Sequence, residues 1–386
     1  MEIKKRIRRI RKKCIILCAK ILTIGKKPSN NKIIIDNFLG KGYGDNPKYI
    51  CNELLKQELG LDIVWLVKDV NCILPPGVRP VKYGTLHSIM EYLTAKIWID
   101  NVRNSFKPNK KENQFYIQTW HGNLGNKKVE GAAEKELPKD YVIDAQRDAS
   151  MTNLMISGSS FFTNLIRDYF WYDGEVMECG TPRLDVFFHE HSALITKVKK
   201  HFDAFEAKII LYAPTFRDNN DVSCYEMNYE RIIDTFEALY DEPCIMLIRM
   251  HPNVSGLSNK LNYSDRIKNA SDYPDLYELI IASEAIITDY SSISFEAGIL
   301  LKPVFLYAVD LHSYIAQRGF LIDPYEQPYP LAVNEEELVY SIIHFNKEQY
   351  NKRLADFNRN LGIIENGCAA SILANRILDE INNKEE

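Results

Sequence analysis

Residues 285–296 read AIITDYSSISFE. An apolar run comes first, polar side chains follow it, and a second apolar pattern begins after them. The run at 285–288 is typical of a short buried strand. Ser291 and Ser292 are typical of the N-cap and first turn of a helix that continues through Leu300. A strand that stops at a helix start exposes backbone N–H groups and a positive dipole end, which together favour a phosphate. Ordinary N-capping explains the same stretch, so the interpretation depends on the rest of the chain.

Three other polar turns directly follow apolar runs. They read QTWHG at 118–122, YAPTFRD at 212–218 and RMHPN at 249–253. In a parallel sheet the carboxyl ends of the strands lie along one edge, where open α/β sheets bind ligands. The four turns therefore predict a binding site at strand ends.

Length and composition indicate an ordinary globular protein with more than one core. The chain has 386 residues, of which 46% are hydrophobic and 26% charged, and this length predicts two domains. The eight cysteines are scattered, without a CxxC pair or a Cys/His cluster at zinc spacing. This pattern favours a reducing compartment and argues against a structural metal.

Positive charge is concentrated at the N-terminus. Residues 1–27 hold eleven Lys or Arg and one acid, a net charge of +10, which leaves −14 for the rest of a chain whose total is −4. Nucleic-acid-binding proteins usually spread basic charge over a folded face. The acidic body therefore argues against nucleic acid as a partner.

The same basic segment has helical periodicity. Its apolar residues recur at steps of three and four: Ile3, Ile7, Ile10, Cys14, Leu17 and Ile21. This spacing predicts a basic amphipathic helix over residues 1–28. The apolar run 14–19 is much shorter than the roughly 20 residues that span a bilayer. Such a helix either lies on an anionic membrane surface, helped by about 1 kcal/mol per base near the headgroups, or packs on the protein itself. We expect the membrane surface.

Strand and helix patterns alternate after residue 29. Strands are predicted at 32–38, 62–67, 78–82, 96–100, 115–119, 154–157, 176–179, 209–212, 244–249, 285–288 and 304–306. Helices are predicted at 47–59, 86–94, 159–170, 229–239, 276–281 and 292–301, with terminal helices at 335–345, 348–357 and 368–381. This alternation predicts an α/β fold with parallel sheets covered by helices on both faces. We expect two doubly wound Rossmann-type domains, 29–180 and 181–360, that face each other across a cleft, and a C-terminal helix in 361–386.

Two loops are weaker evidence for a functional site than the four strand-end turns. The GKGYG segment at 40–44 lacks both the GxGxxG spacing and the GK[ST] ending, so it predicts a tight turn that permits close approach. The polar segment 127–150 predicts a loop or helical excursion near the site.

Two of the eight histidines directly follow apolar strands. His121 precedes Gly122, which gives a partner close access to the imidazole, and His251 precedes Pro252. An imidazole at such a position can take a proton from a hydroxyl or donate one to a leaving group. We interpret His121 as a general base. We interpret His251 as a hydrogen-bond donor to a phosphate or as the acid that protonates the leaving group. A structural role is the alternative for either histidine alone.

Arg217 offers a fork of donors that suits a phosphate, or it pairs with Asp218 at the surface. Arg318, just before Gly319, is a weaker candidate of the same kind. The sequence shows no nucleophile elbow, HExxH motif or carboxylate-rich metal site, although Mg²⁺ can bind substrate phosphates with few protein ligands. These features predict chemistry by positioning and electrostatics around a phosphate.

Seven motifs occur together in this chain. They are QTWHG (118–122), GTPRLD (180–185), LYAPTFRD (211–218), RMHPN (249–253), DYPDLYELI (272–280), TDYSSISFE (288–296) and QRGFLID (317–323). With these motifs the chain resembles the CDP-glycerol glycerophosphotransferase family, whose enzymes prime and extend teichoic acids in Gram-positive bacteria. The resemblance covers roughly residues 118–324.

The resemblance implies a GT-B-like fold and transfer of a polyol phosphate from CDP-glycerol or CDP-ribitol to an acceptor hydroxyl, with release of CMP. It implies that His121 is the base and that the donor pyrophosphate is held by His251, Arg249, Thr288, Ser291 and Ser292. We add Thr215, Arg217 and Arg318 to this donor-binding set.

The resemblance further implies an undecaprenyl-linked or polysaccharide acceptor and a peripheral location on the cytoplasmic face of the cell membrane, which suits the basic helix. We expect no helical-repeat extension. A primase-like or capsule-decorating transferase, which adds one or a few units, therefore explains the sequence as well as a polymerase does.

Two other functions stay open at this stage. One is a GT-B glycosyltransferase or epimerase that uses a nucleotide sugar, and a CDP-versus-UDP donor screen distinguishes it. The other is a non-catalytic scaffold at the membrane surface. The presence of both His121 and His251 argues against the scaffold, which has no use for a base beside a phosphate site.

Overall fold

The computed structural model describes residues 2–122, 124–125, 127–215, 217, 223–250 and 261–382, with the backbone alone at 2–6, 8, 223, 317 and 318. The chain divides into two compact units. Unit 1 comprises Met1–Asn123, Val129–Asp185 and Ile364–Glu386, and unit 2 comprises Leu124–Lys128 and Val186–Ile363. Apart from the short segment Leu124–Lys128, the chain thus enters unit 2 after Asp185, a few residues beyond the predicted division at 180. It returns to unit 1 for the predicted C-terminal helix.

Unit 1 is built on a parallel sheet that, within the described residues, has seven strands in the order β3-β2-β1-β4-β5-β6-β7. The strands are β1 (Ser29–Asp36), β2 (Asp62–Val67), β3 (Val78–Lys82), β4 (Ala95–Asp100), β5 (Phe115–Gln118), β6 (Leu154–Ser157) and β7 (Glu175–Glu178). The order changes direction between β1 and β4. Ligands of doubly wound folds bind at this kind of position, beyond the carboxyl ends of the strands.

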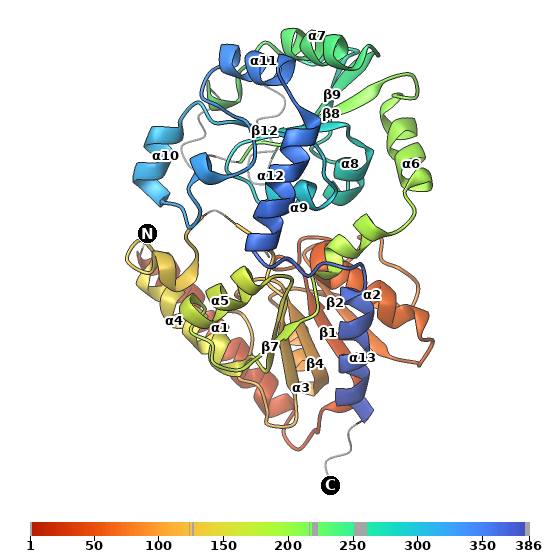
Figure 1. Cartoon of the computed structure of the whole chain (residues 1–386). Coiled ribbons are helices and arrows are strands. Elements are labelled where there is room, and N and C mark those ends of the chain that lie inside the picture. The colour runs from red at the N-terminus through yellow and green to blue at the C-terminus, as the bar shows by residue number, and fades with distance from the viewer. Residues whose placement is uncertain are drawn as a thin grey trace. The chain divides into compact units, whose positions relative to one another are not determined.

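Helices cover both faces of this sheet. They are α1 (Glu2–Leu22), α2 (Asp45–Lys56), α3 (Leu86–Thr94), α4 (Lys139–Met151), α5 (Ser160–Tyr169) and α13 (Ala369–Asn382), with 3-10 turns η1 (Glu130–Ala133) and η2 (Pro182–Phe188). Alternate residues of β1 separate the two cores: Ile33 and Ile35 pack with α2 and α13, whereas Ile34 packs with Tyr92 of α3. Figure 1 shows α13, in blue, alongside α2.

Unit 2 has the same design. Its described residues form a parallel sheet of six strands in the order β10-β9-β8-β11-β12-β13. The strands are β8 (Lys208–Tyr212), β9 (Cys244–Ile248), β10 (Ile267–Asn269), β11 (Ala285–Thr288), β12 (Val304–Tyr307) and β13 (Leu331–Ala332). The helices are α6 (Ser192–Phe202), α7 (Tyr229–Tyr240), α8 (Leu276–Ala282), α9 (Ile293–Ile299), α10 (Leu311–Arg318), α11 (Glu335–Ile343) and α12 (Lys347–Asn360), with 3-10 turns η3 (Ser223–Tyr225) and η5 (Pro324–Glu326).

The predicted fold class, α/β and GT-B-like with two doubly wound domains, is confirmed. The ends of each predicted strand lie within two residues of the prediction, except that β1 begins three residues earlier, at Ser29. Four elements were not predicted from the sequence: β10, β13, α6 and α10. The two missing strands have three and two residues, too few to show a period of two. The excursion at 127–150 contains η1 and α4.

The N-terminal helix α1 has two apolar faces. Ile15, Ile16 and Ala19 pack with Ile89 and Leu93 of α3, so the helix does pack on the protein's own surface. The predicted stripe lies elsewhere: Ile7, Ile10, Leu17 and Ile21 are exposed, Leu17 by 59%, whereas Ala19 is 0% exposed. At about 100° per residue, Ala19 lies roughly 200° around the helix from Leu17. Among the described helices, none combines the length and the hydrophobicity that a membrane span requires.

Candidate functional site

The QTWHG turn lies at the carboxyl end of β5 in unit 1. Its Thr119 N–H donates to the Asp100 carbonyl at the end of the neighbouring strand β4 (2.9 Å). The Gln118 side chain accepts from Trp120 N–H (3.0 Å), and Trp120 has a left-handed backbone with φ of 54°. This local geometry ends the strand and places His121 at the edge where the sequence predicts a site.

The contacts of His121 fix its tautomer. Its Nδ1 lies 2.8 Å from the carbonyl oxygen of Asn101. A carbonyl can only accept, so Nδ1 carries the proton and Nε2 of the neutral ring carries the lone pair. The ring also contacts Phe38 edge-on (centroids 5.2 Å) and Trp120 (4.4 Å).

Burial lowers the pKa of His121 below its usual value, while the Asn101 carbonyl and Asp45 act in the opposite direction. A histidine with a lowered pKa is neutral at pH 7. The imidazole is therefore in the form that a general base needs.

Two motifs meet at Asn46, the second residue of α2. Its side-chain amide donates to the carbonyls of Thr119 (3.4 Å) and Trp120 (3.1 Å), and its oxygen accepts from Arg183 N–H (3.1 Å). The Arg183 guanidinium is paired with Asp45 (3.2 Å). The QTWHG and GTPRLD turns therefore form one assembly in unit 1. Asn46 and Asn101 were not among the predicted site residues, although Asn101 directly follows a predicted strand, which was an available signal.

A buried ionic cluster lies beneath this edge of the sheet. Lys107 is completely buried, and its ammonium lies 2.5 Å from Asp100 and 2.6 Å from Asp148. Arg103 pairs with Asp148 (3.2 Å) and Glu130 (3.0 Å). Although burial raises the pKa of Asp148, the charges of Lys107 and Arg103 outweigh burial and lower that pKa. The cluster joins the end of β4 to α4 and so supports the strand ends that carry Asn101 and His121.

In unit 2, Arg217 joins the turns that follow three strands. Its guanidinium donates to Asp289 after β11 (2.9 Å), to Asp310 after β12 (2.7 and 2.9 Å) and to the Thr215 carbonyl after β8 (2.7 Å). The ring of Tyr290 lies 5.0 Å from the Arg217 guanidinium carbon, and its hydroxyl donates to Asp310 (2.9 Å). Asp218, the partner considered from the sequence, lies outside the described residues. Asp289 and Asp310 were not predicted as partners of Arg217, because they lie 72 and 93 positions away in the chain.

The predicted helix start after β11 is present. Ser292 is the N-cap of α9, although its side chain makes no capping bond to the described backbone. The Ser291 hydroxyl accepts from Ile293 N–H (3.4 Å). The buried Thr288 hydroxyl donates to the Ala213 carbonyl (2.8 Å) and so ties β11 to the turn after β8.

Two further donor-site candidates are the buried Thr215 and the partly buried Arg249. The Thr215 hydroxyl has no hydrogen-bond partner among the described residues, whereas its N–H donates to Asp289 (2.9 Å). Arg249, after β9, donates to the carbonyls of Ala270 (3.1 Å) and Tyr273 (2.6 Å), and burial lowers its pKa. These bonds orient the Arg249 guanidinium at the strand end.

Two predicted residues are not placed. His251 lies outside the described residues, and so does the side chain of Arg318. Within the described ranges, no three His, Cys, Asp or Glu side chains gather as metal ligands would.

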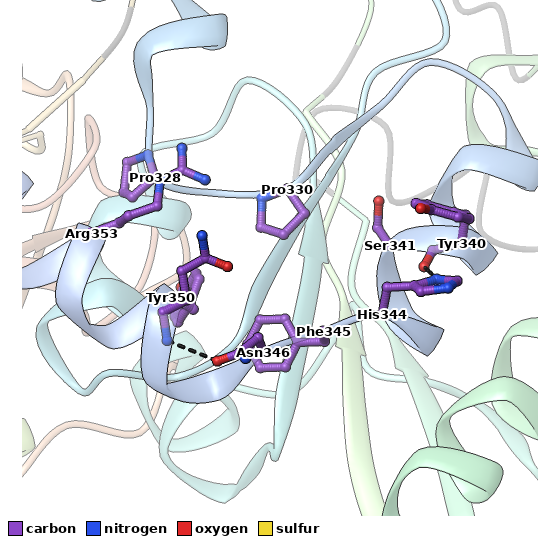
Figure 2. A pocket seen from close by; sticks show the side chains of 10 residues that line it. Pro328, Pro330, Tyr340, Ser341, His344, Phe345, Asn346, Tyr350 and Arg353 are labelled. Carbon is purple, nitrogen blue, oxygen red and sulfur yellow. Dashed lines mark hydrogen bonds between the residues drawn. The ribbon is translucent and has the colours of Figure 1, made fainter.

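A pocket of about 190 Å³ lies elsewhere in unit 2 (Figure 2). Its lining includes Tyr340 and His344, whose rings stack at 4.0 Å, and Arg353. Tyr350 is another lining residue. Its hydroxyl accepts from the N–H of Val304 (3.2 Å), and Val304 is the first residue of β12. The pocket therefore lies at the amino ends of the strands, opposite the edge that carries the predicted turns, and we do not assign it to the site.

Comparisons with known proteins agree with the motif set. A family model described as CDP-Glycerol:Poly(glycerophosphate) glycerophosphotransferase matches residues 20–379. The chain is 32% identical to a teichoic acid poly(glycerol phosphate) polymerase of Staphylococcus epidermidis, over 90% of this chain and 50% of that protein. It is 28% identical to a teichoic acid glycerol-phosphate transferase of Staphylococcus aureus, over 92% and 94% of the two chains. The chain thus spans half the length of the first relative and nearly all of the second.

Solved structures show the same similarity. The wall teichoic acid polymerase TagF superposes with a TM-score of 0.84 at 28% identity over 100% of both chains. A complex of UDP with MnaA from S. aureus superposes with a TM-score of 0.52 at 16% identity, over 92% of this chain and 99% of that one, which shows a shared fold alone.

Proposed function

Because the chain belongs to the CDP-glycerol:poly(glycerophosphate) glycerophosphotransferase family, we propose that it transfers glycerol phosphate from CDP-glycerol to a hydroxyl of a membrane-linked acceptor and releases CMP. The polymer is a teichoic acid or a related cell-surface polymer. The observation that carries the proposal is the hydrogen bond between His121 Nδ1 and the Asn101 carbonyl, which leaves Nε2 as the basic nitrogen at a strand-end turn.

In the proposed reaction, His121 Nε2 takes the proton of the acceptor hydroxyl. The acceptor oxygen forms a bond to the phosphorus that carries glycerol, and the bond from that phosphorus to the bridging oxygen breaks. CMP leaves with the electron pair, and the imidazolium then releases its proton to solvent. The lowered pKa of His121 suits the first step, because the ring is neutral when the acceptor binds.

The donor site is proposed at the carboxyl ends of β8, β9 and β11 in unit 2. The buried hydroxyl of Thr215 has no hydrogen-bond partner among the described residues. This supports the location, because burying a hydroxyl costs free energy unless a ligand supplies its hydrogen-bond partner. Arg249 supplies a positive charge, and Ser291 and Ser292 supply hydroxyl and N–H groups at the start of α9. Arg217 braces these turns and belongs to the same proposed set, as do Thr288, His251 and Arg318 through their motifs.

We place α1 on an anionic membrane surface at the cytoplasmic face, where an undecaprenyl-linked acceptor would be presented. The support is the exposed stripe of Ile7, Ile10, Leu17 and Ile21, which is separate from the face that packs on α3. An apolar stripe flanked by Lys and Arg is the pattern of interfacial helices.

The test is CMP release from CDP-glycerol and CDP-ribitol with a lipid-linked acceptor analogue, for wild type and His121→Ala. We expect acceptor-dependent release from CDP-glycerol that collapses in the variant. Release of CMP from CDP-ribitol alone would show that the transferred group is ribitol phosphate instead of glycerol phosphate. If folded protein releases CMP from neither donor, the proposal fails, and UDP-sugars are then the donors to screen before a scaffold role is considered.

A further inference from the structure

We propose that Asn101 is a positioning residue for His121 and that its side chain acts through Phe38. The proposal rests on the proposed role of His121 as the base. Asn101 is completely buried directly after β4 and contacts the site in two ways. Its carbonyl accepts from His121 Nδ1 (2.8 Å), and its side-chain oxygen accepts from Phe38 N–H (2.9 Å).

Phe38 needs this support because of its backbone. It has φ of 46°, and the next residue, Leu39, has φ of 59°. Both are left-handed conformations that non-glycine residues rarely adopt unless the surroundings hold them. The loop is also fixed at Gly40, whose N–H donates to Asp36 (2.8 Å). A Cβ on Gly40 would lie 3.0 Å from the Lys68 nitrogen, so only glycine fits there.

The remaining donor of Asn101 extends this support along the loop. Its amide donates to the side-chain oxygen of Asn37 (2.8 Å), and the Asn37 amide donates in turn to the carbonyls of Lys41 (3.1 Å) and Gly42 (3.2 Å). Asn101 therefore holds the whole turn after β1. The GKGYG segment, for which the sequence predicts only a tight turn, is part of this hydrogen-bonded turn.

The consequence for catalysis is a single orientation of the imidazole. The Phe38 ring meets the His121 ring edge-on at 5.2 Å, and the Asn101 carbonyl fixes which nitrogen carries the proton. The backbone carbonyl of Asn101 thus sets the tautomer, whereas its side chain, through Phe38, holds the ring against that carbonyl. Loss of the Asn101 side chain leaves the Phe38 N–H without its acceptor, and we expect the loop and the aromatic contact to loosen.

The experiment compares Asn101→Ala with Asn104→Ala as a matched control. Asn104 is also buried, accepts from Phe106 N–H (2.8 Å) and donates to Asp36 (3.0 Å). Among the described residues it binds neither Phe38 nor His121. Its bond goes to Oδ2 of Asp36, whereas the Gly40 N–H of the loop binds Oδ1, so the loop keeps this anchor in the control variant. Both variants lose a buried amide of the same kind three positions apart, so a general loss of stability affects both.

For Asn101→Ala we expect kcat to fall roughly 10- to 100-fold, with the KM for CDP-glycerol changed by less than about twofold, as for a misplaced catalytic group. The backbone carbonyl at position 101 remains in this variant, so the tautomer changes only if the imidazole moves away from that carbonyl once Phe38 is no longer held. We expect this movement, and the ¹⁵N spectrum of His121, assigned by its loss in His121→Ala, should change from one Nδ1–H tautomer to a mixture. Phe38→Ala should show the same two changes, and Phe38→Tyr, which keeps the ring, should retain most of kcat. Asn104→Ala should keep the wild-type tautomer.

An unchanged kcat and tautomer in folded Asn101→Ala would overturn the proposal, and so would an equal loss in Asn104→Ala. The spectrum needs no turnover, so it separates this inference from the proposed function. If the wild type releases no CMP but Asn101→Ala still loses the single tautomer, the positioning role stands and the proposed function fails.

Discussion

Glu365 accepts two hydrogen bonds from Thr181, one from its N–H (2.8 Å) and one from its hydroxyl (2.6 Å), although the residues are 184 positions apart. Nearby, Asp185 accepts from Ala369 N–H (3.0 Å) and Ala370 N–H (2.7 Å) at the start of α13. Both contacts lie in unit 1. They join the segment where the chain leaves this unit to the segment where it returns.

Glu365 should make the stability of the protein depend on pH. Burial raises its pKa from 4.5 to about 7, so the folded state binds the proton more tightly than the unfolded state. This contribution is fully present below about pH 4.5 and is lost as pH rises through about 7. The shift corresponds to an upper limit of about 3 kcal/mol. We expect the free energy of unfolding to fall less between pH 5 and 8 in Glu365→Gln than in wild type, as measured by urea denaturation.

The exposed residue Glu134 supplies the control for this measurement. Glu134→Gln should keep the wild-type pH dependence. A wild-type slope in Glu365→Gln would show that another group is responsible.

His121 should set the acidic limb of the rate profile. Because burial lowers its pKa below 6.5, kcat/KM should rise with pH through that lowered value and be level near pH 7. His121→Ala should lower kcat by roughly 10²- to 10⁴-fold, the usual contribution of a general base. The measurement is CMP release between pH 4.5 and 9. An acidic limb that persists at the same pH in residual His121→Ala activity would contradict this assignment.

Arg217 should stabilise unit 2 more than an exposed arginine does. Its side chain is 10% exposed and pairs with Asp289 and Asp310, so Arg217→Met leaves two carboxylates without their cation. We expect a loss of about 3 kcal/mol in the free energy of unfolding, the lower end for a buried pair, because Asp310 is partly exposed.

The control for Arg217 is Arg266→Met, which removes ion pairs with Glu230 and Asp234 from a more exposed arginine. We expect this variant to lose less than about 1 kcal/mol. Equal losses in chemical denaturation would show that Arg217 is no more important to the fold than a surface residue.

The two faces of α1 should respond differently to an added charge. Leu17→Asp alters the exposed stripe, and we expect it to weaken co-sedimentation with vesicles that contain anionic lipid while the melting temperature stays unchanged. Ala19→Asp places a carboxylate against Ile89 and Leu93, and we expect it to lower the melting temperature. If Leu17→Asp binds the vesicles as wild type does, the stripe is not the membrane face.

The sequence by itself determined the strands of four or more residues, their order and the turns that carry chemistry. These depend on local properties: the periodicity of apolar residues, as in AIIT at 285–288, and the residue types that end a strand, as in His121 after β5. A helix or strand pattern is present within ten or so neighbouring residues, so a single chain is enough to find it.

Only the tertiary structure decided the partners. Arg217 pairs with residues 72 and 93 positions away because the order β8-β11-β12 brings three strand ends together. The proton on His121 is fixed by a carbonyl 20 positions earlier, at the end of the adjacent strand β4. The apolar stripe of α1, which we expected to face a membrane surface, is exposed, but only the structure shows that another face of the same helix packs on α3. Hydrogen bonds and ion pairs act over a few ångströms, so they depend on which distant segments the fold brings side by side.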